Sequence, residues 1–169
     1  VWRLDPATAA VTLLPIGPSW APAAIAPHDS GLFVVSLNGE VRSLDASGAE
    51  LALASGHAPL DAGSALGTPF GLFVNDVAGN LLWFDSDLSA SSILSGCSSF
   101  VPMAWDGELL LGADQLPLHK DAGTWGRFVA ARPVRAGAEF TLEAVLEVPT
   151  WDTPVDVSPG SGVWWVATP

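Results

Sequence analysis

A short strand-like pattern returns along this chain at a fixed interval. Its copies occupy residues 1–5, 41–45 and 81–85, and each ends in Leu-Asp or Phe-Asp. A second element, Gly-Leu-Phe-Val, occupies residues 31–34 and 71–74 with the same step. Repeats of about 40 residues with strand-type composition are typical of propeller blades, which are four-stranded sheets arranged around an axis. The repeat therefore predicts an all-β fold, a β-propeller of about four four-stranded blade equivalents.

The composition agrees with sheets that are covered on both faces. Hydrophobic residues make up 49% of the 169 residues and charged residues only 14%. No apolar run approaches the roughly 18 residues of a membrane-spanning helix, so no membrane span is predicted. Strands buried between neighbouring sheets account for the apolar content. The net charge of −12 disfavours nucleic acid and anionic lipid as partners.

Each repeat resolves into strands joined by recognisable turns. In the clearest unit, strands are predicted at 31–37, 40–45 and 49–54, with Asn38-Gly39 as a two-residue hairpin. A preceding strand is expected at 20–26, and its counterparts at 64–70, 100–105 and 153–157. Each of these four contains a proline near one end, which suits an innermost edge strand.

The fourth unit is longer than the others, and the two ends of the chain complement each other. The extra residues predict an insertion at about 115–138. Residues 1–15 and 151–169 together would supply the strands of one blade, so residues 1–169 are expected to form a single propeller domain. Both a closed four-bladed ring and a segment of a larger propeller fit this pattern.

The sequence of these repeats resembles the PQQ-like (pyrroloquinoline-quinone-type) repeat family. An apolar strand at 31–35, the Asn38-Gly39 hairpin, the Leu44-Asp45 strand end and the Ser47-Gly48 turn follow one another in the order of those repeats. The resemblance implies an extracytoplasmic propeller, periplasmic or secreted. In the quinoprotein dehydrogenases of this family the last strand of a repeat ends in a docking tryptophan, whereas Leu53 stands there here. This difference favours the members that are not enzymes.

The polar residues give no catalytic or metal site. The recurrent Asp5, Asp45 and Asp85 are expected to accept hydrogen bonds from turn N–H groups. The isolated His28, His57 and His119 are expected in exposed loops, without the spacing of zinc ligands. Cys97, the single cysteine, is expected as a buried and inert thiol.

The strongest indication of function is a cluster of basic and aromatic residues in one segment of the chain. Four of the six basic residues lie in or near the predicted insertion of an otherwise acidic chain, and arginine and tryptophan are frequent binding hot spots. The alternative interpretation is a solvated hairpin whose arginines pair with acids such as Glu139. The candidate binding residues are Trp105, Lys120, Trp125, Arg127, Arg132, Arg135 and Trp151.

The sequence thus favours a non-catalytic binding or scaffold propeller that takes another protein or a small ligand, with no cofactor. One alternative is a fragment of a propeller enzyme, a quinoprotein dehydrogenase or a metal-dependent lactonase or lyase. Another is a structural segment of a larger assembly.

Overall fold

The computed structural model describes residues 2–4, 7–13, 22–29, 31–94, 97, 99–114, 126–136, 139–150 and 152–169. Its described elements are β-strands and one 3-10 turn, which confirms the all-β prediction. The strands are β1 (Trp2–Leu4), β2 (Val11–Leu13), β3 (Pro22–His28), β4 (Gly31–Ser36), β5 (Val41–Asp45), β6 (Glu50–Ala54), β7 (Leu66–Thr68), β8 (Gly71–Asn75), β9 (Leu81–Phe84), β10 (Ser91–Ile93), β11 (Phe100–Trp105), β12 (Leu110–Asp114), β13 (Gly126–Ala136), β14 (Glu139–Thr150), β15 (Asp156–Gly160) and β16 (Val163–Ala167), and the 3-10 turn η1 spans Ala62–Ser64.

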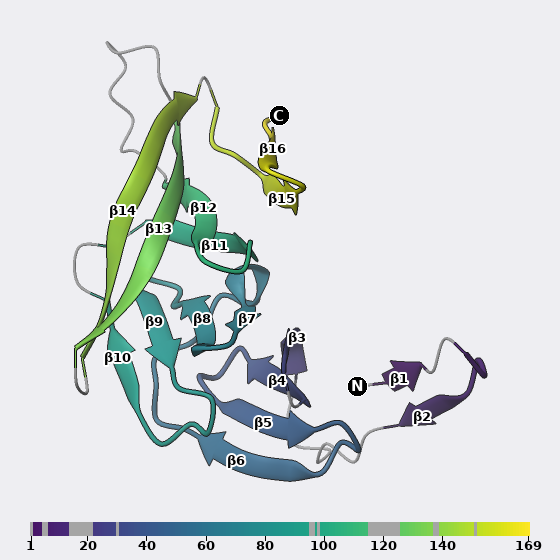
Figure 1. Ribbon diagram of the computed structural model, residues 1–169. Coiled ribbons are helices and arrows are strands. Elements are labelled where there is room, and N and C mark those ends of the chain that lie inside the picture. Colours follow the sequence, from purple (N-terminus) through teal and green to yellow (C-terminus); the bar gives the residue numbers. More distant parts are fainter. Residues whose placement is uncertain are drawn as a thin grey trace.

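The strands form three four-stranded sheets between two two-stranded ribbons. Sheet one holds β3–β6, sheet two β7–β10 and sheet three β11–β14, each in chain order with antiparallel neighbours. The N-terminal ribbon is β1–β2 and the C-terminal ribbon is β15–β16. The first strands β3, β7, β11 and β15 contact one another in succession, and the sheets follow an arc with the two ribbons at its opposite ends (Figure 1).

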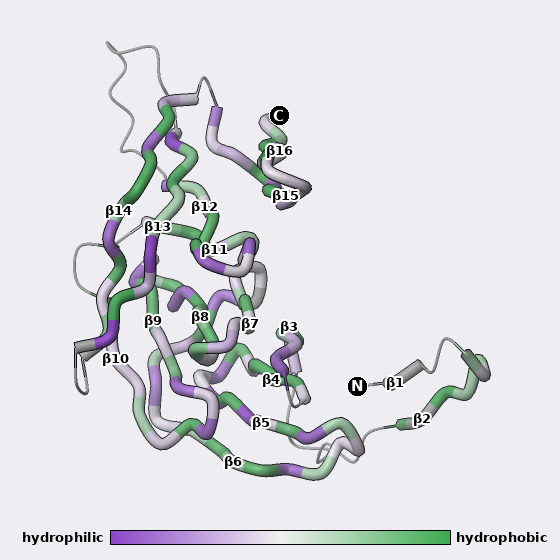
Figure 2. Tube along the Cα trace, viewed as in Figure 1, coloured by the Kyte–Doolittle hydropathy of each residue, from purple (hydrophilic) through white to green (hydrophobic). Residues whose placement is uncertain are grey.

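The hydrophobic core lies between consecutive sheets. Phe33 and Val35 of sheet one pack against Leu72 and Val74 of sheet two. Separate clusters fill the space between sheets two and three, and between sheet three and the C-terminal ribbon. Sheet two is covered on both sides, so every residue of β8 and β9 is buried. Figure 2 shows hydrophobic residues along β4 and β12, strands that also contribute to these clusters.

The turns predicted from Asn38-Gly39 and the aspartates are present, with one correction. The Asn38-Gly39 loop holds three residues rather than two, because Ser36 N–H bonds to Glu40 O, and Gly39 adopts a φ of 88°. This is the three-residue hairpin with a left-handed glycine. The Asp45 carboxylate accepts the N–H groups of Ser47 and Ala49 at 2.8 and 3.0 Å, and Asp85 accepts that of Ala90 at 3.0 Å. Both predicted turn aspartates are confirmed, while Asp5 lies outside the described residues.

The glycine that opens each Gly-Leu-Phe-Val element is required by the neighbouring strand. A Cβ at Gly31 would lie 1.9 Å from the carbonyl oxygen of Leu44, and one at Gly71 would lie 2.0 Å from that of Phe84. Leu44 and Phe84 are themselves one repeat apart, so the repeat reproduces this contact as well as the pattern. The recurrence of glycine thus has a steric cause.

The predicted first strands are present with shifted bounds. The prediction at 100–105 matches β11, whereas the strand expected at 20–26 lies at Pro22–His28 and the one expected at 153–157 lies at Asp156–Gly160. Pairing shifts follow Pro22 in β3 and Pro102 in β11, where a missing N–H is tolerated.

Sheet three has much longer outer strands than the other sheets. Its β13 and β14 have 11 and 12 residues, whereas β5 and β6 have 5 each. Within the insertion predicted at 115–138, residues 126–136 form β13, and the others lie outside the described residues. Because neighbouring strands alternate in direction, the β3–β4, β7–β8, β11–β12 and β13–β14 hairpins turn at the same end of the strands in their sheets, named here the hairpin end. Its opposite is named the loop end.

Candidate functional site

Arg127 stands at the loop end, at the start of β13, and is held by two carboxylates. It lies opposite Asp114 in the pairing of β12 with β13, and its guanidinium donates to the Asp114 carboxylate. A second N–H group donates to Glu147 Oε2 at 2.6 Å. The hydrogen bond to Asp114 raises the pKa of Arg127 above its ordinary value, against the effect of burial. The geometry fits the alternative in which arginines of this region pair with acids, although the partners here are Asp114 and Glu147.

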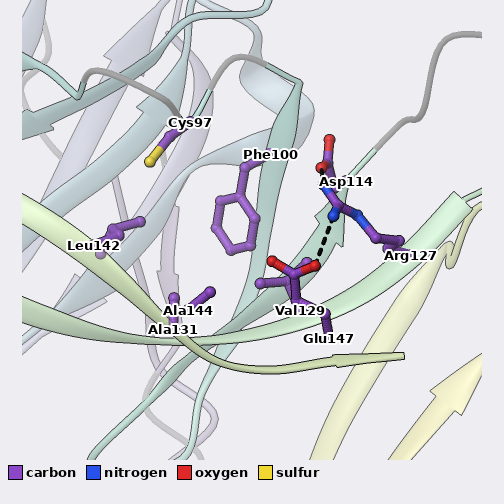
Figure 3. Close-up of a pocket in the computed structure, with 9 residues that line it drawn as sticks. All are labelled: Cys97, Phe100, Asp114, Arg127, Val129, Ala131, Leu142, Ala144 and Glu147. Atoms are coloured by element: carbon purple, nitrogen blue, oxygen red, sulfur yellow. Dashed lines mark hydrogen bonds and ion pairs between the residues drawn. The ribbon is translucent and has the colours of Figure 1, made fainter. Parts of the chain in front are cut away.

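A small cavity of about 100 Å³ adjoins this ion-paired group (Figure 3). Phe100, Val129 and Leu142 give it apolar walls, and the Cys97 side chain lies on its far side from Arg127. Burial, with a smaller contribution from the Asp114 charge, raises the pKa of the Cys97 thiol. Cys97 is half-buried rather than buried as predicted. With its raised pKa it is a neutral thiol at pH 7 and a weak nucleophile.

A larger groove, of about 390 Å³, lies at the hairpin end near the innermost strands. Trp105, at the end of β11, contributes its ring and makes an edge contact with Phe70, with ring centroids 5.6 Å apart. Phe70 is itself exposed. The residues that line the groove come from three sheets and are Pro27, His28, Asp29, Gly67, Thr68, Pro69 and Trp105.

His28 gives this groove a neutral polar group. Its ring packs against Phe33, with centroids 4.4 Å apart, so it is half-buried rather than exposed as the sequence suggested. Burial lowers the pKa of His28 below 6.5, and the nearby Asp29 charge opposes this effect only in part. The imidazole is therefore uncharged at neutral pH. His57 likewise packs against a ring, that of Phe84, at 4.7 Å.

The structure separates the candidate binding residues instead of gathering them. Arg127 lies at the loop end, whereas Trp105 lies at the hairpin end. Arg132 reaches Glu108 in the β11–β12 turn at 3.0 Å, and Arg135 lies 5.8 Å over the ring of Trp83. Lys120, Trp125 and Trp151 lie outside the described residues.

Sequence reasoning found Trp105 but missed the residues that share its groove. The signal was present, since His28 and Thr68 are one repeat apart and so occupy equivalent places in successive units. Both are the last residues of first strands, paired with Gly31 and Gly71. Residues that are one repeat apart in the sequence therefore meet at the same end of neighbouring sheets, even when they are different amino acids.

The described residues contain neither a candidate metal site nor a membrane-spanning helix. Across the described ranges, no three His, Cys, Asp or Glu side chains come together in a way that could hold a metal ion. Nor does that part of the chain include a helix long and apolar enough to cross a membrane.

Comparison with known proteins gives no relative to guide the assignment. No protein-family model, no curated protein and no solved structure matches this chain.

Proposed function

We propose that this protein is a non-catalytic binding module, built as a β-propeller arc, that receives a small ligand or a segment of another protein at its hairpin end. The adjacent first strands β3, β7, β11 and β15, with cores between successive sheets, support the propeller arrangement. The PQQ-like resemblance of the repeats supports it too, and extends the proposal to an extracytoplasmic location.

The groove beside Trp105 is the observation that carries this proposal. It combines an aromatic ring with a carboxylate and a neutral imidazole, while the rest of its lining is Thr68, proline and glycine. The Thr68 hydroxyl is engaged in its own turn, where it donates to Gly71 O and accepts the N–H group of Phe70. Ligand sites are typically concave, with a few polar groups set among apolar ones. Because three sheets contribute the lining, the groove is preformed by the packing of the arc rather than by one loop.

Arg132 and Arg135 extend the proposed surface along the β13–β14 hairpin. Arg132 is paired with Glu108, but both side chains are largely exposed, so their ion pair is worth little and yields readily to a partner. Arg127 serves mainly to join β12, β13 and β14.

Binding is tested by titrating the ¹⁵N-labelled chain with a set of small fragment molecules and short peptides. The expected result is that at least one member shifts the amide signals of His28, Asp29 and Thr68 and the indole signal of Trp105. Trp105→Ala should abolish these shifts. Asp29→Asn, which changes an exposed side chain without disturbing packing, should weaken binding several-fold.

Leu51→Ala is the matched control, because Leu51 is exposed on β6, outside the groove. Its titration should equal that of the wild type. Shifts that spare the groove, or no shifts at all, would refute the proposed site. Calcium and a quinone absorbance band in the purified protein would favour the propeller-enzyme alternative instead.

A further inference from the structure

The groove beside Trp105 contains a carboxylate whose charge no basic side chain balances. Asp29 is exposed directly after β3, and none of the ion pairs formed among the described residues involves it. The neighbouring His28 lines the same groove, but burial lowers its pKa, so at pH 7 its imidazole adds no positive charge. No lysine or arginine from the described part of the chain lines the groove. The groove therefore carries a negative charge at neutral pH.

An aromatic ring lines the same groove. Trp105 ends β11, and its ring meets that of Phe70 edge-on, with centroids 5.6 Å apart and planes 84° apart. Phe70 is 43% exposed, so the two rings form an aromatic corner that solvent reaches. The face of an aromatic ring, and that of tryptophan above all, attracts a cation through its quadrupole. The ring and the carboxylate therefore favour a ligand of the same charge.

The rest of the lining is unsuited to an anion. Proteins bind anions with basic side chains or with several converging N–H groups. Pro27 and Pro69 have no N–H group, and the Thr68 hydroxyl donates to Gly71 O at 3.1 Å. The net charge of −12 repels anions and attracts cations over the whole molecule. A cation is thus the ligand that both the groove and its surroundings favour.

An organic cation matches the groove better than a metal ion does. Calcium and magnesium take about six or more oxygen ligands. The lining supplies a single carboxylate, and nowhere in the described ranges do three His, Cys, Asp or Glu side chains come together to hold a metal ion. An organic cation spreads its charge over a partly apolar group, so one carboxylate and one aromatic face suffice to bind it. A groove of about 390 Å³ has room for such a group.

We propose that the groove beside Trp105 recognises an organic cation, an ammonium or guanidinium group that pairs with the Asp29 carboxylate and packs on the Trp105 ring. This inference rests on the proposed function and names the chemical class of its ligand. Asp29 follows β3 and Trp105 ends β11, and β7 contacts both strands, so their spacing is set by packed sheets (Figure 1). The same chemistry has two sources, a small quaternary ammonium compound or an arginine side chain in a segment of another protein.

Two matched pairs of probes test the charge preference and distinguish the sources. Choline is compared with dimethylbutanol, its neutral carbon isostere, and acetylarginine amide with acetylcitrulline amide, by NMR titration of the ¹⁵N-labelled chain at pH 7. We expect the cation of at least one pair to shift the amide signals of His28 and Asp29 and the indole signal of Trp105. That cation should bind about tenfold more tightly than its neutral counterpart. A preference within the choline pair identifies a small ammonium ligand, and one within the arginine pair identifies a protein segment.

Substitutions separate the two recognition groups. Asp29→Asn should weaken binding of the cation to the level of its neutral counterpart and leave the neutral compound unaffected. Trp105→Leu, which keeps apolar bulk but removes the aromatic face, should weaken binding of the cation several-fold. Asp152→Asn is the matched control, because it removes the same charge from an exposed residue outside the groove. Loss of the preference in this control would show a general attraction to the acidic surface and would overturn the inference.

Equal binding of the two members of each pair, or no binding of either cation, would also overturn the inference. The proposed function would still stand if another member of the fragment set shifted the signals of the groove, and it would fall if none did. The two proposals therefore fail separately.

Discussion

At the scale of single residues, the buried carboxylate of Asp76 stabilises the turn between β8 and β9. Asp76 is only 5% exposed, yet its oxygens accept the N–H groups of Ala78 and Asn80 and the side-chain amide of Asn80, at 2.8 to 2.9 Å. Burial alone would raise the pKa of Asp76, but these hydrogen bonds outweigh it and hold the pKa below 3.8. The ionised form is therefore favoured in the folded protein.

The consequence is a pH-dependent contribution to stability. Because the folded pKa of Asp76 is lower than its unfolded pKa, the contribution is complete above the unfolded value and disappears as the pH falls through the folded one. We expect Asp76→Asn to lower the free energy of unfolding by about 2 kcal/mol at pH 7. The difference from wild type should shrink below pH 3.8.

Urea denaturation at a series of pH values measures this difference. Asp152→Asn, at an exposed carboxylate, is the control and should change stability by less than about 0.5 kcal/mol. A deficit in Asp76→Asn that stays constant down to pH 2 would contradict the assigned cause.

At the scale of elements, the long β13–β14 hairpin joins two sheets. Its tip carries Phe140, which stacks on Trp83 of sheet two with centroids 4.5 Å apart and planes 12° apart. Phe140 also contacts Phe73 and Phe70 at 5.6 and 6.1 Å. The hairpin therefore reaches back over the preceding sheet and covers the core between sheets two and three.

We expect Phe140→Ala to destabilise the protein by about 3 kcal/mol, because it leaves a cavity beneath Trp83. Val145→Ala, on the same strand but exposed, should cost less than about 0.5 kcal/mol. Guanidinium denaturation followed by tryptophan fluorescence measures both. Equal effects of the two substitutions would show that the tip is not part of the core.

Local features at this scale were predictable from the sequence, whereas contacts between distant elements were not. The Gly-Leu-Phe-Val strands and the Asp45 turn were predictable because their chemistry is local and recurs with the repeat. The contact of Phe140 with Trp83 was not, because a strand pattern does not reveal how far a hairpin extends or which sheet its tip meets. For the same reason Arg127 and Trp105 were grouped as one candidate surface, although they lie at opposite ends of the strands of sheet three.

At the scale of the whole molecule, a glycine allows sheets one and two to approach closely. A Cβ at Gly67 on β7 would lie 1.9 Å from the carbonyl oxygen of Pro27 on β3. Backbone atoms on both sides leave no flexible side chain to move aside. The spacing of the innermost strands therefore depends on the absence of a side chain at this residue.

Gly67→Ala should force these strands apart and cost about 1–3 kcal/mol. Gly63→Ala is the matched control, since a Cβ there meets only the Asp61 carboxylate, at an ordinary 3.4 Å. Thermal denaturation compares the two variants. A melting temperature for Gly67→Ala equal to that of the control would show that the sheets adjust without cost.

The pairing of each strand with its chain neighbour has a consequence for how the protein folds. In sheets one and two the strands follow one another after short connections, so each sheet forms without waiting for distant parts of the chain, and the cost in loop entropy is small. In sheet three, residues 115–125 separate β12 from β13. Cooperativity then comes from the surfaces between sheets, as in a row of coupled units. Sheet two, with neighbours on both sides, is the most protected unit, and loss of structure proceeds inward from the two ends of the row.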